Sequence, residues 1–368
     1  MSEASPWPDA TLRHIVTRFR VDGDVGDIVP FGNGHIHDTF AVTLRTPGGS
    51  RREVLQRVNH HVFRDVPAVQ RNIELVTAHV RAKLSGAADL ERRVLTFHQT
   101  HQGGTFHRDE DGNFWRLCPL LEGTVSHDNL SGPEQAEEVA RAFGEFQLLL
   151  ADLDAGQLAE TIPFFHDGPR RLAAFRAARE ADVKGRVAGA GPEIAFVEDR
   201  ADVYRVLADE VAAGRIPVRI THNDTKVNNV LMDEATGRAV CVIDLDTVMP
   251  GLAVYDFGDM VRTGANSGDE DDRDLNRVSL DEARFEAMLR GYLASAGGFL
   301  NAAEREHLVF ACRYFALLIG TRFLTDHLAG DTYFRIHRED HNLQRARAQF
   351  KLAASIEARE TALRALVG

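Results

Sequence analysis

The residues best suited to chemistry in this sequence are a small set of carboxylate and amide side chains in its second half. His222 is followed by Asp224, Asn229 comes five residues after that aspartate, and an apolar segment then leads to Asp244 and Asp246. An ionised aspartate can take a proton from a hydroxyl group, and carboxylate and amide oxygens are ligands of Mg²⁺. Two aspartates at the end of a buried strand, two residues apart and so on one face, require a cation or strong hydrogen-bond donors nearby. The set therefore predicts a polar site with a cation or strong donors at the end of this strand.

The flanking sequence predicts the elements that hold this set in place. Apolar residues alternate at 218–220 and 230–232, residues 234–237 are typical of a turn, and residues 240–245 are typical of a strand buried on both faces. The spacing H-x-D-x-x-x-x-N, followed by a strand that ends in Asp, resembles the catalytic and metal loops of protein-kinase-like phosphotransferases.

That resemblance implies a role for each side chain. Asp224 would be the base that takes the proton of the acceptor hydroxyl, Asn229 and Asp244 would hold Mg²⁺, and Asp246 would have a supporting or second-metal role. The structural alternative is that Asp224 caps a turn and that the two later aspartates lie in a solvated loop. The complete set at this spacing favours the catalytic interpretation.

The composition is that of a globular protein with two lobes or domains. The chain has 368 residues, of which 44% are apolar and 27% charged, and its net charge of −12 argues against nucleic acid as a partner. Three scattered cysteines in apolar settings predict reduced thiols of a cytosolic protein. The first residues lack the features of a signal peptide, and no apolar run reaches membrane-spanning length. We therefore expect a cytoplasmic protein without a membrane partner.

A glycine-containing segment near the N-terminus is a candidate phosphate loop. Gly32, Asn33 and Gly34 lie between two strand-like segments, the second of which begins near Thr39. Glycine lets the backbone approach a ligand, and successive N–H groups can cradle a phosphate. Because the segment is not G-x-G-x-x-G, a plain hairpin turn is the alternative.

The expected third strand, residues 53–59, has no lysine for the α- and β-phosphates. Arg57 or Gln56 must fill that role, and we prefer Arg57 for its charge; an exposed strand arginine is the alternative. A helix over residues 65–84 follows, with Glu74 beside its apolar stripe. Glu74 either pairs with the strand cation or remains solvated.

The two lobes are expected to meet near residue 121. Residues 113–118 are typical of a strand, which runs into a linker at 119–123. The linker backbone around Leu121 would contact adenine. This predicts an N-lobe at 1–121 and a mostly helical C-lobe at 122–368.

One arginine of the C-terminal helices lies in an unusual setting. The helix expected over residues 303–328 is apolar nearly all round and therefore buried, so Arg322 needs a partner. Either Asp326, one turn later, pairs with Arg322 and so stabilises the fold, or Arg322 contacts the substrate. The acidic loop at 265–274 is either solvated surface or a wall that attracts cations.

Several separated stretches resemble the bacterial N-acetylhexosamine 1-kinases, a branch of the aminoglycoside-phosphotransferase/choline-kinase superfamily. The H-x-D-x-x-x-x-N and I-D stretches mark only the superfamily, whereas D-L-D-T-V-M-P-G and R-F-L-T-D…G-D-T-Y-F are more specific to the branch. The stretches that carry the resemblance are residues 32–40, 54–59, 72–74, 222–226, 243–251, 322–326 and 330–334.

The resemblance implies an α+β, protein-kinase-like two-lobed fold, with a small β-sheet N-lobe that has one main helix and a large, mostly helical C-lobe. It implies ATP and Mg²⁺, and phosphorylation of the anomeric (C1) hydroxyl of N-acetylglucosamine or N-acetylgalactosamine. The nucleotide contacts would be Gly32, Asn33, Gly34, Thr39, Arg57, Glu74 and Leu121, and the sugar contacts His35, His37, Asp224, Arg322 and Tyr333.

Two other functions remain open. A kinase for a cationic acceptor, such as an aminoglycoside or choline, is supported by the negative net charge of the chain and by the acidic loop at Asp269 to Asp272. A choline site would require an aromatic cage, and the two tryptophans, Trp7 and Trp115, lie outside the expected C-lobe. A nucleotide-binding module without turnover is disfavoured by the intact acidic motif.

Overall fold

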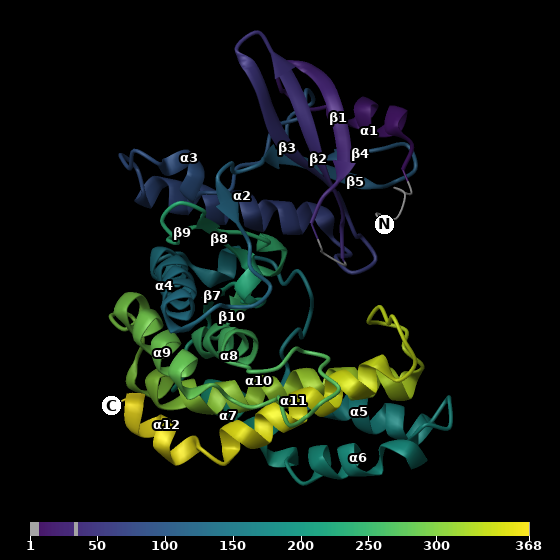
Figure 1. Cartoon of the computed structure of the whole chain (residues 1–368), viewed down its shortest axis with the longest axis vertical. Coiled ribbons are helices and arrows are strands. Elements are labelled where there is room, and N and C mark those ends of the chain that lie inside the picture. The colour runs from purple at the N-terminus through teal and green to yellow at the C-terminus, as the bar shows by residue number, and fades with distance from the viewer. Residues whose placement is uncertain (1–6, 33–35, 368) are drawn as a thin grey trace.

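The computed structural model describes residues 7–32 and 36–367, so the predictions for Asn33, Gly34 and His35 lie outside the described residues. Two lobes are stacked along the long axis of the molecule (Figure 1). The N-lobe holds an antiparallel five-stranded sheet of order β1-β2-β3-β5-β4. Its strands are β1 (Asp24–Pro30), β2 (Asp38–Thr46), β3 (Gly49–Val58), β4 (His107–Arg108) and β5 (Phe114–Pro119).

The two faces of this sheet have different characters, because successive side chains of a strand point to opposite sides. One face packs its apolar side chains against α1 (Asp9–Val16). On the other face Thr39, Gln56 and Arg116 stand in one row across β2, β3 and β5. This polar row is directed at the C-lobe, where Arg116 meets Asp246.

The main N-lobe helix, α2 (Val66–Lys83), connects the lobes. Asp65 caps its first turn by accepting a hydrogen bond from the Ala68 N–H at 2.9 Å. Its apolar side packs with α4 (Pro133–Leu150) and with the catalytic strands of the C-lobe. Asn72 of α2 donates to the Val248 carbonyl at 3.0 Å and so ties the helix to the C-lobe. A short helix, α3 (Leu90–Arg93), follows.

Two small sheets of the C-lobe flank the acidic motif that includes Asp224, Asn229 and Asp244. The chain leaves β5 and enters β6 (Thr124–Val125), which pairs with β8 (Val230–Asp233) and β9 (Ala239–Val242). A second pair joins β7 (Arg219–Thr221) to β10 (Met249–Gly251). The main chain passes from the five-stranded sheet to these small sheets between Pro119 and Thr124, and the lobe boundary near residue 121 stays a prediction.

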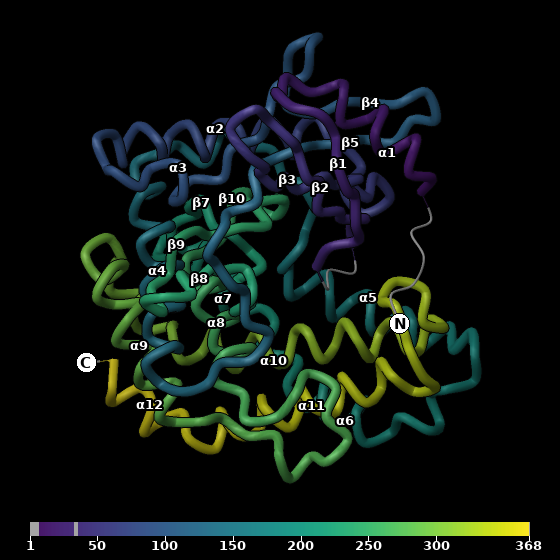
Figure 2. Tube along the Cα trace, turned by 45° about the horizontal axis from the view of Figure 1, so that its top comes forward, coloured from purple at the N-terminus to yellow at the C-terminus, as the bar shows by residue number. Residues whose placement is uncertain are grey.

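Helices make up the remainder of the C-lobe. They are α5 (Gly168–Ala181), α6 (Gly191–Glu198), α7 (Val206–Ala212), α8 (Ala253–Gly264), α9 (Glu282–Ala296), α10 (Ala302–Ala329), α11 (His341–Glu357) and α12 (Glu360–Val367). Figure 2 shows α10 and α11 side by side along the base of the molecule. A capping box between Asn301 and Glu304 starts α10.

Helix α10 corrects one expectation from the sequence. It has 28 residues and is long and apolar enough to cross a membrane, although no stretch was expected to reach that length. However, 83% of its most apolar window is buried inside the protein. The helix is apolar all round because it lies in the centre of the C-lobe core, with neighbours on every side.

Candidate active site

The loop after β7 is held by a buried carboxylate that the sequence analysis did not single out. Asp256, in the first turn of α8, accepts hydrogen bonds from the backbone N–H groups of His222 (2.9 Å) and Asn223 (2.8 Å) and from the Gln147 amide (2.6 Å). Asn223 has φ of +65°, a left-handed conformation that costs energy for a residue with a side chain. These bonds stabilise the turn that presents Asp224. A signal was available in the sequence, because Asp256 lies among apolar residues at the start of this helix.

Asp224 emerges from this loop with two polar neighbours. Its carboxylate lies 3.0 Å from the Lys226 ammonium, and the Asn229 amide nitrogen donates to its backbone oxygen at 2.9 Å. Burial raises the pKa of Asp224, but the Lys226 ammonium, with smaller contributions from His222 and Arg262, offsets burial and leaves that pKa below its usual value. Asp224 is therefore ionised at neutral pH, as a proton acceptor must be. Lys226, two residues after it, is a further site residue that the sequence analysis missed.

Asn229 and Asp244 are brought together by the pairing of β8 with β9. The Ile243 N–H donates to the Asn229 carbonyl at 2.9 Å, which sets Asp244 beside the end of the short 3₁₀ turn Val227–Asn229. The Asn229 amide nitrogen is occupied, so its side-chain oxygen is the ligand that remains. The Asp244 carboxylate accepts no hydrogen bond from any residue in the described part of the chain.

The charge around Asp244 suits a hard cation. Desolvation, together with the nearby negative charges of Asp246 and Asp224, raises the pKa of Asp244 to about 6. A divalent cation would remove this unfavourable charge accumulation. The two oxygen donors of Asn229 and Asp244 therefore fit Mg²⁺, which prefers oxygen ligands.

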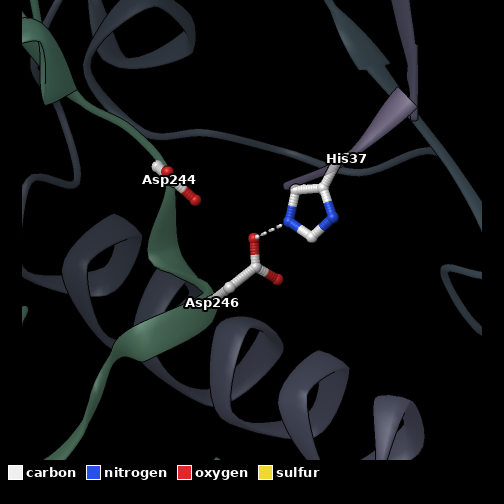
Figure 3. A group of neighbouring side chains, drawn as sticks. All are labelled: His37, Asp244 and Asp246. Atoms are coloured by element: carbon white, nitrogen blue, oxygen red, sulfur yellow. Dashed lines mark hydrogen bonds and ion pairs between the residues drawn. The ribbon is translucent and has the colours of Figure 1, made fainter. Parts of the chain in front are cut away.

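Asp246 has a different environment from the one expected of a metal ligand. Both of its oxygens accept hydrogen bonds from the Arg116 guanidinium, each at 2.6 Å, and one also lies 3.2 Å from the His37 ring (Figure 3). His37, Asp244 and Asp246 are close enough together to suggest a three-residue metal site. We favour a two-residue site, because three hydrogen bonds already occupy most of the lone-pair sites of Asp246 and Arg116 compensates its charge.

The expected phosphate contacts of the N-lobe are not assembled around Arg57. Arg57 faces the α1 side of the sheet, where it pairs with Asp38 at 2.6 Å and lies over the Trp7 ring. Glu74 is exposed and accepts a hydrogen bond from Thr105 rather than pairing with a strand cation. Arg116 on β5 instead lies on the opposite, C-lobe-facing side.

The other expected nucleotide contacts lie along the edge between the lobes. Gly32 has φ of +78°, which favours glycine at this position of the loop. Thr39 accepts a hydrogen bond from Gln56 at 3.2 Å and so belongs to the polar row. The Leu121 carbonyl accepts from the Thr124 hydroxyl at 2.7 Å, so this acceptor is already used in the linker turn.

Asp326 does not pair with Arg322, contrary to the structural expectation. The turn after α10 folds back, and the backbone N–H groups of Thr332, Tyr333 and Phe334 donate to the Asp326 carboxylate at 2.8–2.9 Å. The Asn342 amide adds a fourth donor at 2.9 Å. Because Asp326 is saturated by these donors, the Arg322 guanidinium is left for another partner.

Arg322 lies among aromatic rings instead. Its guanidinium carbon is 5.1 Å from the ring centre of Phe165, 5.8 Å from Tyr333 and 5.5 Å from Phe334. No hydrogen bond or ion pair to this guanidinium occurs within residues 7–32 and 36–367. Its donors therefore remain unused beside an aromatic surface.

His166 connects this aromatic cluster to the catalytic loop. Its Nε2–H donates to the Asn223 carbonyl at 2.8 Å, one residue before Asp224, and its ring packs against that of Phe165 in a tilted arrangement. Burial lowers the pKa of His166 to about 3, so the ring is neutral. Arg171 donates to the Phe165 carbonyl at 2.8 Å. Burial and the Arg322 charge lower the pKa of Arg171 to about 10. The acceptor side of Asp224 thus combines two guanidinium groups with aromatic rings.

The acidic loop is not a free wall of negative charge. Glu270 pairs with the buried Arg262 of α8 at 2.7 Å, and Asp271 pairs with Arg338 at 2.9 Å and lies 2.8 Å from His341. These partners compensate the loop charges. The loop therefore offers weaker support for a cationic acceptor than its sequence suggests.

Comparison with known proteins places this geometry in a family. A model of the phosphotransferase enzyme family matches residues 27–309. An aminoglycoside phosphotransferase from Alicyclobacillus acidocaldarius has a similar structure, with a TM-score of 0.64 and 14% identity over 98% of each chain. Spectinomycin phosphotransferase, solved with ADP and spectinomycin, superposes with a TM-score of 0.60 and 11% identity over 96% of this chain and 99% of that one.

A choline/ethanolamine kinase family protein from Mesorhizobium loti is also similar, with a TM-score of 0.51 and 19% identity over 93% of this chain and 92% of that one. The neighbours confirm the predicted protein-kinase-like fold with its small antiparallel sheet and helical C-terminal region. Since the family model covers most of the chain, this protein belongs to the phosphotransferase enzyme family.

Proposed function

We propose that this protein is a cytoplasmic, ATP- and Mg²⁺-dependent kinase that phosphorylates the C1 hydroxyl of a 2-acetamido sugar, N-acetylglucosamine or N-acetylgalactosamine. The observation that carries the proposal is the Arg322 guanidinium, which is released from Asp326 and lies among three aromatic rings near the catalytic loop. The family resemblance of the segments around it supports the choice of sugar and of C1.

The residues of the loop suit direct in-line transfer. Asp224 accepts the proton of the sugar hydroxyl, and its ionised state at neutral pH supports that role. Lys226, 3.0 Å from Asp224, supplies a positive charge near the transferred phosphoryl group. Asn229 and Asp244 would hold Mg²⁺, which neutralises phosphate charge when bound. Catalysis here depends on positioning and electrostatics more than on covalent chemistry by the protein.

The acceptor side favours a neutral sugar over a cationic acceptor. Arg322 and Arg171 repel ammonium groups, and Glu270 and Asp271 of the acidic loop are paired with arginines. Guanidinium N–H groups donate to hydroxyl or acetamido oxygens, and an aromatic ring such as that of Tyr333 can lie against the apolar face of a sugar. Partly buried donors of this kind discriminate against analogues that lack the matching acceptor.

The test is a product assay by ³¹P NMR with N-acetylglucosamine, N-acetylgalactosamine, glucose, kanamycin and choline as separate acceptors. We expect an anomeric phosphate from the acetamido sugars, little product from glucose, and almost none from the cationic acceptors. An ester at a non-anomeric carbon, or kanamycin or choline as the best acceptor, would contradict the proposal. If none of these acceptors leads to ADP release, the result would point to another acceptor class.

A further inference from the structure

We propose that Arg116 of β5, rather than a residue of the third strand, is the N-lobe cation that positions the candidate metal site. It holds Asp246 across the boundary between the lobes and thereby sets the position of Asp244, the candidate Mg²⁺ ligand. The inference concerns nucleotide and metal binding, so it does not depend on which acceptor the enzyme uses.

The contact between Arg116 and Asp246 is buried and directional. Two parallel hydrogen bonds of 2.6 Å join the guanidinium to the carboxylate, and the two side chains are only 3% and 1% exposed. Arg116 belongs to the N-lobe sheet, whereas Asp246 lies in the short 3₁₀ turn Leu245–Thr247 of the C-lobe. A bidentate pair of this kind fixes orientation as well as distance. It therefore links the placement of one lobe to that of the other.

His37 adds a second N-lobe donor to the same carboxylate. The backbone N–H of Asn59 donates to His37 Nδ1 at 3.1 Å, so Nδ1 must carry a lone pair. The ring proton is then on Nε2, which donates to Asp246 at 3.2 Å. The ring also stacks on Phe63 with centres 5.6 Å apart. His37 is thereby committed to Asp246 in this structure, rather than to the sugar contact that the resemblance implies.

Gln56 explains why the third strand needs no lysine. It occupies the position of β3 directly between Thr39 and Arg116. Its side-chain oxygen accepts a hydrogen bond from Arg116 Nε at 3.0 Å, and its nitrogen donates to the Thr39 hydroxyl at 3.2 Å. A lysine here would place a second cation against the Arg116 guanidinium. The neutral amide instead orients Arg116, and the exposed Glu74 has no strand cation to pair with.

The turn that contains Asp246 connects this pair to the catalytic loop. Asp246 is two residues from Asp244, which has a left-handed φ of +59° and is sensitive to shifts of its neighbours. Next in the chain, the Thr247 hydroxyl donates to the His222 carbonyl at 2.7 Å, and the Asn223 amide donates to the Thr247 carbonyl at 3.0 Å. Loss of the Arg116 contact therefore releases the segment that carries the metal ligand.

The experiment compares nucleotide binding by calorimetry, with and without Mg²⁺ and without an acceptor, in wild type, R116K and the double variant R116M/D246L. The double variant removes both charges, so no unpaired buried charge remains to unfold the protein. We expect it to melt close to wild type but to bind Mg·ATP about tenfold more weakly. Binding of metal-free ATP should change much less, because the effect acts through Asp244.

R52M is the matched control, because Arg52 of the same sheet makes a bidentate pair with Glu122 on the exposed surface. It should bind both forms of ATP as wild type does. R116K retains the charge but not the two parallel bonds, and should weaken Mg·ATP binding to a smaller extent. If the double variant does not fold, R116K decides the question. Mg·ATP binding equal to wild type in the folded variants, or an equal loss with and without Mg²⁺, would overturn the proposal.

Discussion

Replacement of Asp256 by asparagine tests whether this buried carboxylate holds the catalytic loop. One oxygen accepts from the Asn223 N–H, and the other accepts from the His222 N–H and from Gln147. The asparagine side chain keeps one oxygen acceptor and gains one NH₂ group. It loses the fewest hydrogen bonds when the NH₂ group takes the place of the oxygen that faced only the Asn223 N–H. That donor then has no acceptor, which costs about 1–3 kcal/mol. The two remaining bonds are no longer charge-assisted, which costs about 1 kcal/mol each.

The expected loss of unfolding free energy is therefore about 3–5 kcal/mol, a large part of a typical stability of about 5–15 kcal/mol. Turnover should fall as well, because the left-handed conformation of Asn223, next to Asp224, loses its support. Urea denaturation and steady-state kinetics of the folded variant measure the two effects.

Asp281→Asn is the matched control for this prediction. Asp281 caps α9 by accepting from the Arg284 N–H at 3.1 Å. Asparagine caps a helix about as well as aspartate, so this change should cost less than about 0.5 kcal/mol. If Asp256→Asn costs no more than Asp281→Asn and leaves kcat unchanged, the role that we assign to Asp256 is refuted.

Three other predictions concern the same region. Asp224→Asn should lower kcat by several orders of magnitude while ATP binding and melting temperature stay near wild type; near-normal kcat would exclude Asp224 as the base. Arg322→Ala should raise KM for the acceptor sugar about ten- to hundredfold and leave KM for ATP unchanged, because its donors lie on the acceptor side; equal effects on both KM values would argue against that placement. His166 has a folded-state pKa of about 3, below its unfolded value, so its contribution to stability is complete above the unfolded pKa and is lost as pH falls. Wild type should lose up to about 1.4 kcal/mol more per pH unit than His166→Asn below about pH 6.5, and parallel stability curves of the two proteins would contradict this.

The parts of the site that lie close together in the chain could be predicted from the sequence. Asp224 and Asn229 are five residues apart and are brought together by one short loop. Asp244 follows through a hairpin of adjacent strands, so its approach to Asn229 is also a local event. The two-lobed, kinase-like fold was predictable for a related reason, because apolar alternation and helical stripes are local patterns.

The choice of Arg57 as the phosphate cation shows where this kind of prediction fails. Arg57 and Gln56 are neighbours, so they lie on opposite faces of β3. Which face meets the C-lobe depends on how the whole sheet packs, and the structure places Gln56 on that face and Arg57 against Asp38. Charge alone could not decide between them.

Residue types at short and regular spacing were enough to predict the phosphotransferase family, the fold and the central acidic motif. The partners of the charged groups that are far apart in the chain became clear only from the folded structure. Asp246 is paired with Arg116, 130 positions away, and Asp326 is saturated by a returning turn rather than by Arg322. The physical reason is that an ionised side chain takes whichever donors folding brings within about 3 Å. Sequence distance says little about that choice once the chain has folded back on itself.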